Sequence, residues 1–90
     1  MSKPAIEVGA VVKSTAGRDE GRVFVVIESL DEEYVLISDG DTHKIEKPKK
    51  KKRKHLKLSY LPDNEIAERL RNGKQAENYE IRKWLSDKEE

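Results

Sequence analysis

The segment RVFVVIESL limits the possible folds more than any other stretch, because it is apolar on both of its faces. In a strand, neighbouring side chains point to opposite faces of the sheet. The two faces here carry different apolar sets, Val23, Val25 and Ile27 on one and Phe24 and Val26 on the other. We therefore predict a central strand, or a strand whose second face is covered by another part of the chain.

Further segments have the alternating or β-branched pattern of strands, and tight turns separate them. They are VGAVVKS at 8–14, YVLISDG at 34–40, THKIE at 42–46 and HLKLSYL at 55–61. THKIE places Ile45 inward, and HLKLSYL alternates Leu56 and Leu58 with polar residues. The turns are TAGRDEG, LDEEY and SDGD, the last with an Asp-Gly hairpin signal. Short strands joined by tight turns favour a mainly β fold, a small closed barrel, since closure hides the edges of the sheet.

The apolar period becomes helical towards the C-terminus. DNEIAERLRNG offers Asp63 or Asn64 as an N-cap and ends at Asn72 and Gly73. ENYEIRKWLSDKEE has one apolar face, made of Ile81, Trp84 and Leu85 with Tyr79 nearby. Helices this short are marginal alone, so they must dock on the barrel or on a partner.

The chain is small, and its polar composition limits the core. It has 90 residues, of which 34% are hydrophobic and 41% are charged, so we expect one small domain with a modest core. We predict a barrel over residues 1–61, which includes a basic loop at 47–57, and a helical extension over residues 62–90. Cysteine is absent, and no apolar stretch reaches the roughly 18 residues of a membrane span. We expect a soluble, cytoplasmic protein without disulfides or membrane contact.

Positive charge is concentrated in one segment. The net charge is only +1, but residues 48–62 carry seven basic side chains and no acidic one. Positive side chains occupy every position from Lys49 to Lys54. We interpret this run as a long loop or hairpin end on a rigid body, with its last residues entering a strand and Pro48 limiting strand pairing at its start. Such dense cations favour nucleic acid as the partner. A localisation signal and an inert solvated surface remain the alternatives.

A second basic group surrounds residues 14–21, which we call the glycine loop. Lys13, Arg18 and Arg22 lie in or beside it, and Gly17 and Gly21 allow a positive φ or a close approach of ligand to backbone. The few aromatic residues of the chain form no cluster in the sequence that would stack several bases. Recognition of the shape and backbone of a folded RNA therefore fits better than reading of unstacked bases.

Neither metal binding nor catalysis finds support in the sequence. SDGDTH holds Asp39, Asp41 and His43, but an EF-hand loop starting at Asp39 would need glycine and glutamate where the chain has Lys44 and Lys50. GRDEG lacks the Gly-Lys-Ser/Thr of a P-loop, and no nucleophile with a base stands out. We predict no enzyme, no metal, no cofactor and no small-molecule substrate.

The stretch VGAVVKSTAGRDEGRVFVVIES resembles a KOW motif, the short β-loop-β signature of ribosomal and transcription-associated proteins. Gly9, Gly17 and Gly21 have the spacing of that family, and the basic Arg22 follows the last of them. Phe24 stands where many members have another glycine, which favours a subgroup. PAIEVGAVVKSTAGRDEGRVFVVIESLDEEYVLISDG is similar to the opening of large-subunit ribosomal protein type fourteen-e, and KHLKL to its closing strand. A bacterial branch of small KOW-domain RNA-binding proteins shares KPKKKKRKH still more closely.

This resemblance covers roughly residues 5–60 and implies an SH3-like barrel that binds ribosomal RNA without catalysis. Ribosomal proteins are further partners on this hypothesis. The RNA contacts that it implies are Lys13, Arg18, Arg22, Lys49, Lys50, Lys51, Lys52, Arg53, Lys54 and His55, with Gly17 and Gly21 supplying loop backbone. For His55 a surface or packing role is the alternative, because a lone histidine at the start of a strand more often has one.

KOW-type barrels also resemble modules that contact proteins in transcription and translation complexes. The alternative function is therefore a protein-interaction or transcription-associated module that contacts RNA polymerase or another protein through the C-terminal helices. The face of Tyr79, Ile81, Trp84 and Leu85 would then be an anchor in a partner's groove. Otherwise it is the packing face of a terminal helix.

Overall fold

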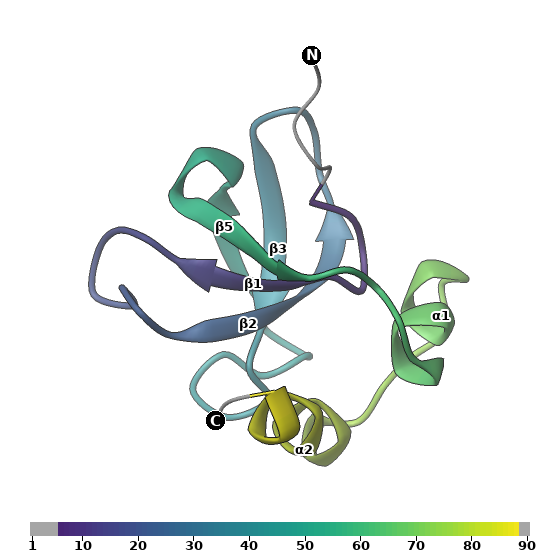
Figure 1. The fold of residues 1–90 in the computed structure, drawn as a ribbon. Helices are drawn as coiled ribbons and strands as arrows, with labels where there is room; N and C mark the ends of the chain where they lie inside the picture. The colour runs from purple at the N-terminus through teal and green to yellow at the C-terminus, as the bar shows by residue number, and fades with distance from the viewer. Residues whose placement is uncertain (1–5, 89–90) are drawn as a thin grey trace.

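The structure is a computed structural model and describes residues 6–88. Figure 1 shows a curled sheet with two helices beside it. The elements in chain order are β1 (Val11–Ser14), β2 (Val23–Ser29), β3 (Tyr34–Ser38), β4 (Lys49–Lys52), the 3₁₀ turn η1 (Arg53–His55), β5 (Leu56–Tyr60), α1 (Glu65–Arg71) and α2 (Asn78–Lys88).

The strands form one antiparallel sheet in the order β4-β3-β2-β1-β5. β4 and β5 stand at its two edges, yet only the 3 residues of η1 connect them. The sheet therefore has to curl until its edges meet at this turn. The backbone N–H of Thr15 donates to the carbonyl of His55 there (2.9 Å). The predicted mainly β fold is confirmed, and the curl is compatible with a small SH3-like barrel.

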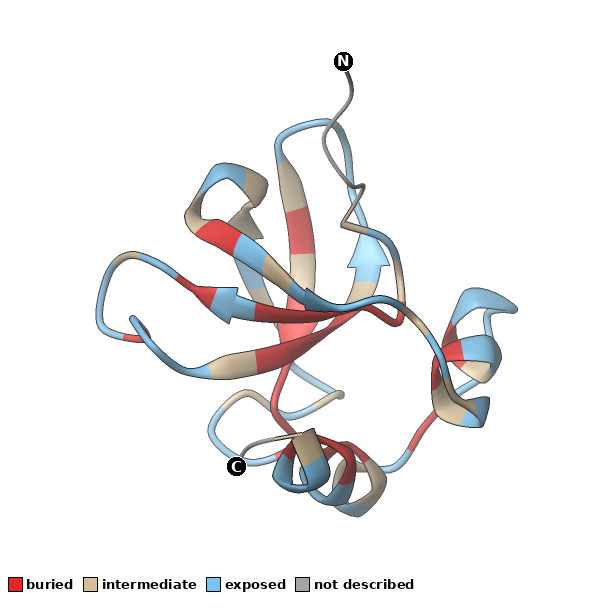
Figure 2. Cartoon of the chain, viewed as in Figure 1, coloured by how far each residue is buried: buried red, intermediate tan, exposed pale blue. Residues whose placement is uncertain are grey.

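β2 lies in the middle of the sheet and contributes to a hydrophobic core on each face, as predicted. On one face, Phe24 and Val26 join a core that the strands share among themselves. On the other face, Val25 joins Val11 in a core that the two helices cover. Figure 2 shows these buried residues on the central strands and on both helices.

α1 begins and ends at the residues that the sequence indicates. The side-chain oxygen of Asn64 accepts a hydrogen bond from the backbone N–H of Ala67 (2.8 Å), which satisfies one free donor of the first turn. Asn72 follows the last turn, and Gly73 then has a φ of 78°, where glycine is favoured.

The helices dock on the sheet of their own chain. Ile81, Trp84 and Leu85 are buried in the core shared with β1 and β2. Of the two roles open for this face, packing within the chain is the one that these three side chains have in the structure. Tyr79, in contrast, is 61% exposed.

Residues 42–46 do not form the predicted strand. The carboxylate of Asp39 accepts hydrogen bonds from the backbone N–H groups of Asp41 (2.9 Å) and His43 (2.8 Å), which bends the chain into a loop. Ile45 still packs against the core beside the helices, as its inward placement predicted. The loop holds the start of α2, because the side-chain oxygen of Asn78 accepts from the N–H of Ile45 (2.8 Å).

The basic loop predicted at 47–57 is wrong for Lys49–Lys52, which form β4, whereas its last residues enter the strand β5 as expected. β4 pairs with β3, so that Ile37 lies opposite Lys49 and Tyr34 lies opposite Lys52. The edge of β3 offered backbone N–H and C=O groups, and pairing with them outweighed the low strand propensity of lysine. β4 begins immediately after Pro48, in agreement with the expected limit on pairing.

Candidate nucleic-acid interface

The glycine loop projects beyond the ends of β1 and β2 (Figure 1). Two backbone hydrogen bonds close its base, from Ser14 to the carbonyl of Arg22 (2.9 Å) and from Gly21 to the carbonyl of Ser14 (2.8 Å). Gly17 and Gly21 have φ values of 81° and 89°, so both take the positive φ that was predicted for them. Arg18 is exposed in this loop.

β4 lies beside the glycine loop, although the two are far apart in the sequence. The ammonium of Lys51 donates to the backbone carbonyl of Ala16 (3.1 Å). The ammonium of Lys49 forms an ion pair with Asp19 (3.2 Å). The two basic segments that the sequence singled out therefore form one continuous surface.

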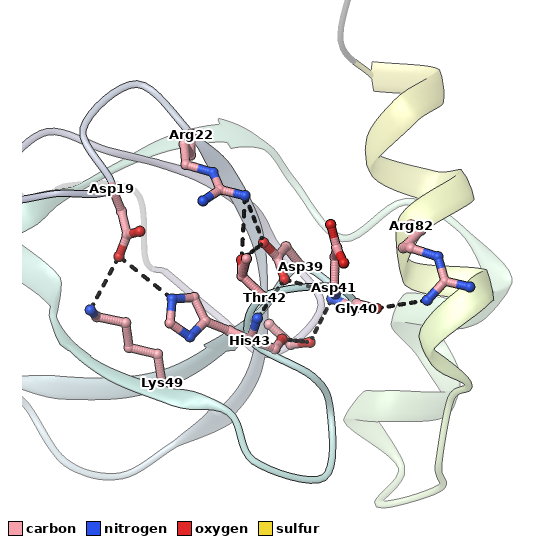
Figure 3. A network of polar contacts seen from close by, with 10 residues as sticks. Asp19, Arg22, Asp39, Gly40, Asp41, Thr42, His43, Lys49 and Arg82 are labelled. Atoms are coloured by element: carbon pink, nitrogen blue, oxygen red, sulfur yellow. Dashed lines mark hydrogen bonds and ion pairs between the residues drawn. The ribbon is translucent and has the colours of Figure 1, made fainter.

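Asp19 is a buried acid within this basic surface (Figure 3). Its carboxylate lies 3.2 Å from the ammonium of Lys49 and 3.8 Å from Nε2 of His43. Burial by itself would raise the pKa of Asp19, but the close ion pair with Lys49 and the charges of His43 and Lys51 outweigh it and lower that pKa. Asp19 therefore stays ionised and ties the loop to β4.

The other lysines of β4 point away from the glycine loop, because neighbouring residues of a strand face opposite sides. The ammonium of Lys50 lies 4.4 Å from the ring centroid of Tyr34, and that of Lys52 lies 5.9 Å from it. This aromatic face favours a cation above it. Lys54, in η1, is exposed. The run thus presents cations on two sides of one strand.

Two of the three predicted arginine contacts, Arg22 and Arg53, are engaged within the protein. Arg53 donates to the backbone carbonyls of Ile6 (2.7 Å) and Asp31 (3.0 Å) and to the hydroxyl of Ser29. Its guanidinium therefore holds the turn between β2 and β3, a role that the sequence did not indicate.

Arg22 bonds to the loop that precedes β4. Its guanidinium contacts the carboxylate of Asp39 (3.2 Å) and the hydroxyl of Thr42 (3.3 Å), as Figure 3 shows. Its side chain is still 48% exposed, so one edge of the guanidinium remains accessible.

Other predicted residues lie at the margins of this surface. Lys13 is exposed on β1, and His55 is half-buried at the end of η1. Sequence reasoning missed Lys44 and Lys47, which line a shallow hollow together with Lys49. Lys44 is isolated in the sequence and Lys47 is separated from the continuous run by Pro48, and the fold of the preceding loop brings both next to β4.

The residues named by the rejected metal hypothesis have structural partners instead. Asp39 uses its carboxylate in its own turn and in the contact with Arg22. Within residues 6–88, no three His, Cys, Asp or Glu side chains are grouped so that they could hold a metal ion. None of the helices in that range is long and apolar enough to cross a membrane.

No protein-family model matches the chain. It is similar to archaeal large ribosomal subunit proteins eL14. The protein of Desulfurococcus amylolyticus is 36% identical over 53 residues, which are 59% of this chain and 55% of that protein. The protein of Methanococcus vannielii is 49% identical over 37 residues, 41% of this chain and 47% of that protein. The protein of Staphylothermus marinus is 46% identical over 35 residues, 39% of this chain and 36% of that protein.

The chain spans about half the length, or less, of the curated relatives that it matches. These relatives are ribosomal proteins rather than enzymes, which supports the prediction that the chain is not an enzyme. The predicted resemblance is confirmed over the matched stretch, where the chain is similar to large ribosomal subunit proteins eL14.

Proposed function

We propose that this protein binds ribosomal RNA through a surface made by the glycine loop and β4. The observation that supports this most directly is the bond from Lys51 to the carbonyl of Ala16, because it joins the two basic segments into one surface. The similarity to eL14 proteins of the large ribosomal subunit supports the choice of RNA. On this proposal the protein works in the cytoplasm, with ribosomal proteins as neighbours.

The cations of this surface differ in whether a neighbouring carboxylate partly neutralises them. The side chains of Lys50, Lys52, Lys54 and Arg18 form no ion pair within residues 6–88. They are the principal phosphate contacts on this proposal. Lys49 and Arg22 are partly neutralised by Asp19 and Asp39, so they position the surface more than they attract RNA.

The surface should bind with little choice of base sequence. Contacts of lysine with phosphate release counterions from the nucleic acid, and this gain depends on the number of contacts and not on the bases. The exposed backbone at Gly17 and Gly21 adds contacts to the sugar-phosphate chain. Tyr34 lies under Lys50 rather than open to a base, so stacking contributes little.

The test is the double variant Lys50→Ala/Lys52→Ala. Its affinity for fragments of large-subunit ribosomal RNA is measured by fluorescence anisotropy over a range of salt concentrations. We expect binding to all fragments to weaken by a similar factor, and the slope of log K against log salt to become shallower by about 1.5 to 2.

The matched control is Lys74→Ala/Lys83→Ala, which removes the same charge from exposed lysines of the helical part. It should leave both affinity and salt slope unchanged. Arg53→Lys is a second control, because it keeps the charge and removes the forked contacts to Ile6 and Asp31. It should lower stability and preserve the salt slope. If the Lys50/Lys52 variant binds as the unmodified protein does, this surface is not where RNA binds.

A further inference from the structure

The loop between β3 and β4 surrounds a shallow hollow of about 450 Å³. Three lysines, Lys44, Lys47 and Lys49, line it together with His43. The backbone N–H of Lys47 donates to the carbonyl of Lys44 (2.9 Å), so these two lysines stand at the ends of one turn. One acid, Asp41, also lines the hollow. Positive side chains therefore outnumber negative ones around this small space.

Two of these lysines have no compensating charge in the described part of the chain. The ammonium groups of Lys44 and Lys47 form no ion pair within residues 6–88, and both residues are exposed. The pKa of Glu46 is lowered by hydrogen bonds from the amide of Asn78 (2.9 and 3.1 Å) and then by the charge of Lys44, so this acid already has a partner. An anion that enters the hollow would therefore meet two uncompensated ammonium groups.

His43 connects the hollow to the buried acid of the glycine loop (Figure 3). Its Nε2 lies 3.8 Å from Oδ2 of Asp19, and its side chain is 27% exposed. The ammonium of Lys49 approaches the same oxygen at 3.2 Å as an ion pair. This oxygen is nevertheless buried without a hydrogen bond from any group within residues 6–88. A protonated imidazole has an N–H group on both nitrogens, so it could donate to Asp19 and still have a second donor to offer.

The surroundings of His43 come from four parts of the chain. Asp19 belongs to the glycine loop, Lys49 to β4, and Phe24 of β2 contributes an uncharged ring whose centroid lies 5.9 Å from that of the imidazole. Asp39, which follows β3, accepts a hydrogen bond from the backbone N–H of His43 (2.8 Å). The pKa values of Asp19 and Asp39 are both lowered, so these acids stay ionised over the range in which histidine exchanges its proton.

The charges of this group leave room for one further anion. Asp19 carries one negative charge, which cannot balance both the ammonium of Lys49 and a protonated His43. A second negative charge in the hollow would share these two cations with Asp19 and would favour the protonated imidazole. Proton uptake by His43 and binding of an anion in the hollow should therefore strengthen each other.

We propose that this hollow binds one phosphate group of the RNA, and that His43 takes up a proton as the phosphate enters. Nε2 of the imidazole donates to Asp19 and Nδ1 to the phosphate, while Lys44 and Lys47 supply the remaining charge. The inference rests on the proposed function, because it adds one contact to the same RNA surface and makes RNA binding depend on pH.

The first test changes the charge of the hollow. Fluorescence anisotropy measures affinity for fragments of large-subunit ribosomal RNA that carry a 5′-hydroxyl. Lys44→Ala/Lys47→Ala should bind about fivefold more weakly, with a salt slope shallower by about 0.7 to 0.9, the value for one phosphate. Lys44→Arg/Lys47→Arg should restore binding, because it restores the charge. Asp41→Asn should act in the opposite direction and strengthen binding, since it removes the negative charge from the lining.

The second test changes pH. The unmodified protein should bind these fragments about fivefold more tightly at about pH 5.5 than at about pH 8, because histidine gains its proton in this range. His43→Gln should bind with the same affinity at both pH values. His55→Gln, at the other histidine of the chain, should keep the gain. Lys74→Ala/Lys83→Ala, at exposed positions of the helical part, should keep it as well.

Nuclear magnetic resonance of the unmodified protein measures the proton on His43 without a substitution that could disturb the loop. At about pH 7, addition of RNA should move the ring signals of His43 towards the positions that they have in the free protein at about pH 5.5. Ring signals that do not move on addition of RNA would overturn the inference. Urea unfolding of Lys44→Ala/Lys47→Ala should match that of the unmodified protein, since both positions are exposed.

A third comparison identifies the source of the phosphate. Fragments with a 5′-phosphate are measured beside the same fragments with a 5′-hydroxyl. If Lys44→Ala/Lys47→Ala weakens binding of both kinds equally, the hollow holds a phosphate within the RNA chain. If the loss occurs only with the 5′-phosphate, the hollow holds the end of the RNA. No loss with either kind refutes the site.

The outcomes also distinguish this inference from the function on which it rests. If Lys50→Ala/Lys52→Ala weakens binding and Lys44→Ala/Lys47→Ala does not, the hollow is no phosphate site and the proposed function stands. If His43→Gln keeps the full dependence on pH, the proton is taken up elsewhere and the inference fails. If neither lysine variant changes binding, the proposed function fails, and the inference fails with it.

Discussion

Single acidic side chains organise the loops around the basic surface. Asp39 accepts hydrogen bonds from Asp41, His43 and Thr42 and contacts Arg22 at 3.2 Å. Burial by itself would raise the pKa of Asp39, but these hydrogen bonds and the Arg22 charge outweigh it and lower that pKa below its ordinary value of 3.8. The loop therefore depends on an ionised carboxylate.

This dependence predicts an effect of pH on stability. Because the pKa of Asp39 is lower in the folded state than in the unfolded state, its stabilisation is complete above the ordinary value of 3.8 and is lost as pH falls through the folded-state pKa. Asp39→Asn should reduce the free energy of unfolding by about 1.5–3 kcal/mol at pH 7, the range for hydrogen bonds to charged groups. The difference from the unmodified protein should shrink as the pH falls below 3.8 and the carboxylate of Asp39 becomes protonated.

Urea unfolding followed by the fluorescence of Trp84, the single tryptophan of the chain, measures this difference. Thr15→Ala, at an exposed position of the glycine loop, is the control and should show no such dependence on pH. A difference between Asp39→Asn and the unmodified protein that stays constant from pH 7 to pH 2 would show that the carboxylate charge is not what holds the loop.

Among the strands, β4 has the least usual composition, because it consists only of lysine. It is an edge strand, and lysines at an edge discourage pairing with strands of other proteins. Its backbone is occupied on one side by β3, while its ammonium groups reach Asp19, Ala16 and the ring of Tyr34. On the proposed function, this strand contacts a polyanion rather than another sheet.

Among the helices, α2 is held against the sheet by the packing of Trp84. The indole ring is 4% exposed and packs in the core beside Val11 and Val25. Its Nε1 is buried, and no hydrogen-bond acceptor within residues 6–88 reaches it. The ring therefore stabilises the helix through apolar contact, while its N–H group is an energetic cost.

This balance predicts different costs for two substitutions of Trp84. Trp84→Ala should lower the free energy of unfolding by about 3–5 kcal/mol, because it leaves a cavity. Trp84→Phe should change it by less than about 1.5 kcal/mol, since the smaller ring also removes the unpaired donor. Urea unfolding followed by circular dichroism measures both values. Equal costs for Phe and Ala would mean that the indole N–H has a favourable contact after all.

The molecule as a whole consists of one curled sheet with a core on each face. The second core exists only because α1 and α2 cover Val11 and Val25, which are completely buried. The division into a barrel of residues 1–61 and an extension of residues 62–90 therefore separates two parts that share a core. The division of the chain at residue 62 therefore stays a prediction.

We expect that a chain shortened after Leu61 does not fold cooperatively. Truncation exposes the face of Val11 and Val25, and the remaining small chain has only one core to offset its conformational entropy. Thermal unfolding followed by circular dichroism is the measurement. Tyr79→Ala in the full chain, at an exposed position of α2, is the control and should shift stability by less than about 0.5 kcal/mol. If the shortened chain unfolds cooperatively at the same midpoint, the helices are dispensable for the fold.

Much of this architecture follows from short-range patterns in the amino-acid sequence. Apolar residues on both faces of β2 require a covered central strand, and that is what β2 is. Asn64 and Gly73 mark the ends of α1 because caps act on neighbouring backbone groups. The density of cations between Pro48 and Pro62 is likewise a property of composition alone.

Only the tertiary structure decided which groups these segments meet. The lysine run is a strand because the edge of β3 was free to pair with it, and pairing turned Lys49 and Lys51 towards the glycine loop. The guanidinium of Arg53 is bound to Ile6 and Asp31, partners far from it in the sequence. Periodicity and turn chemistry act over a few residues, whereas the partner of a strand edge or a charged side chain is chosen by the folding of the whole chain.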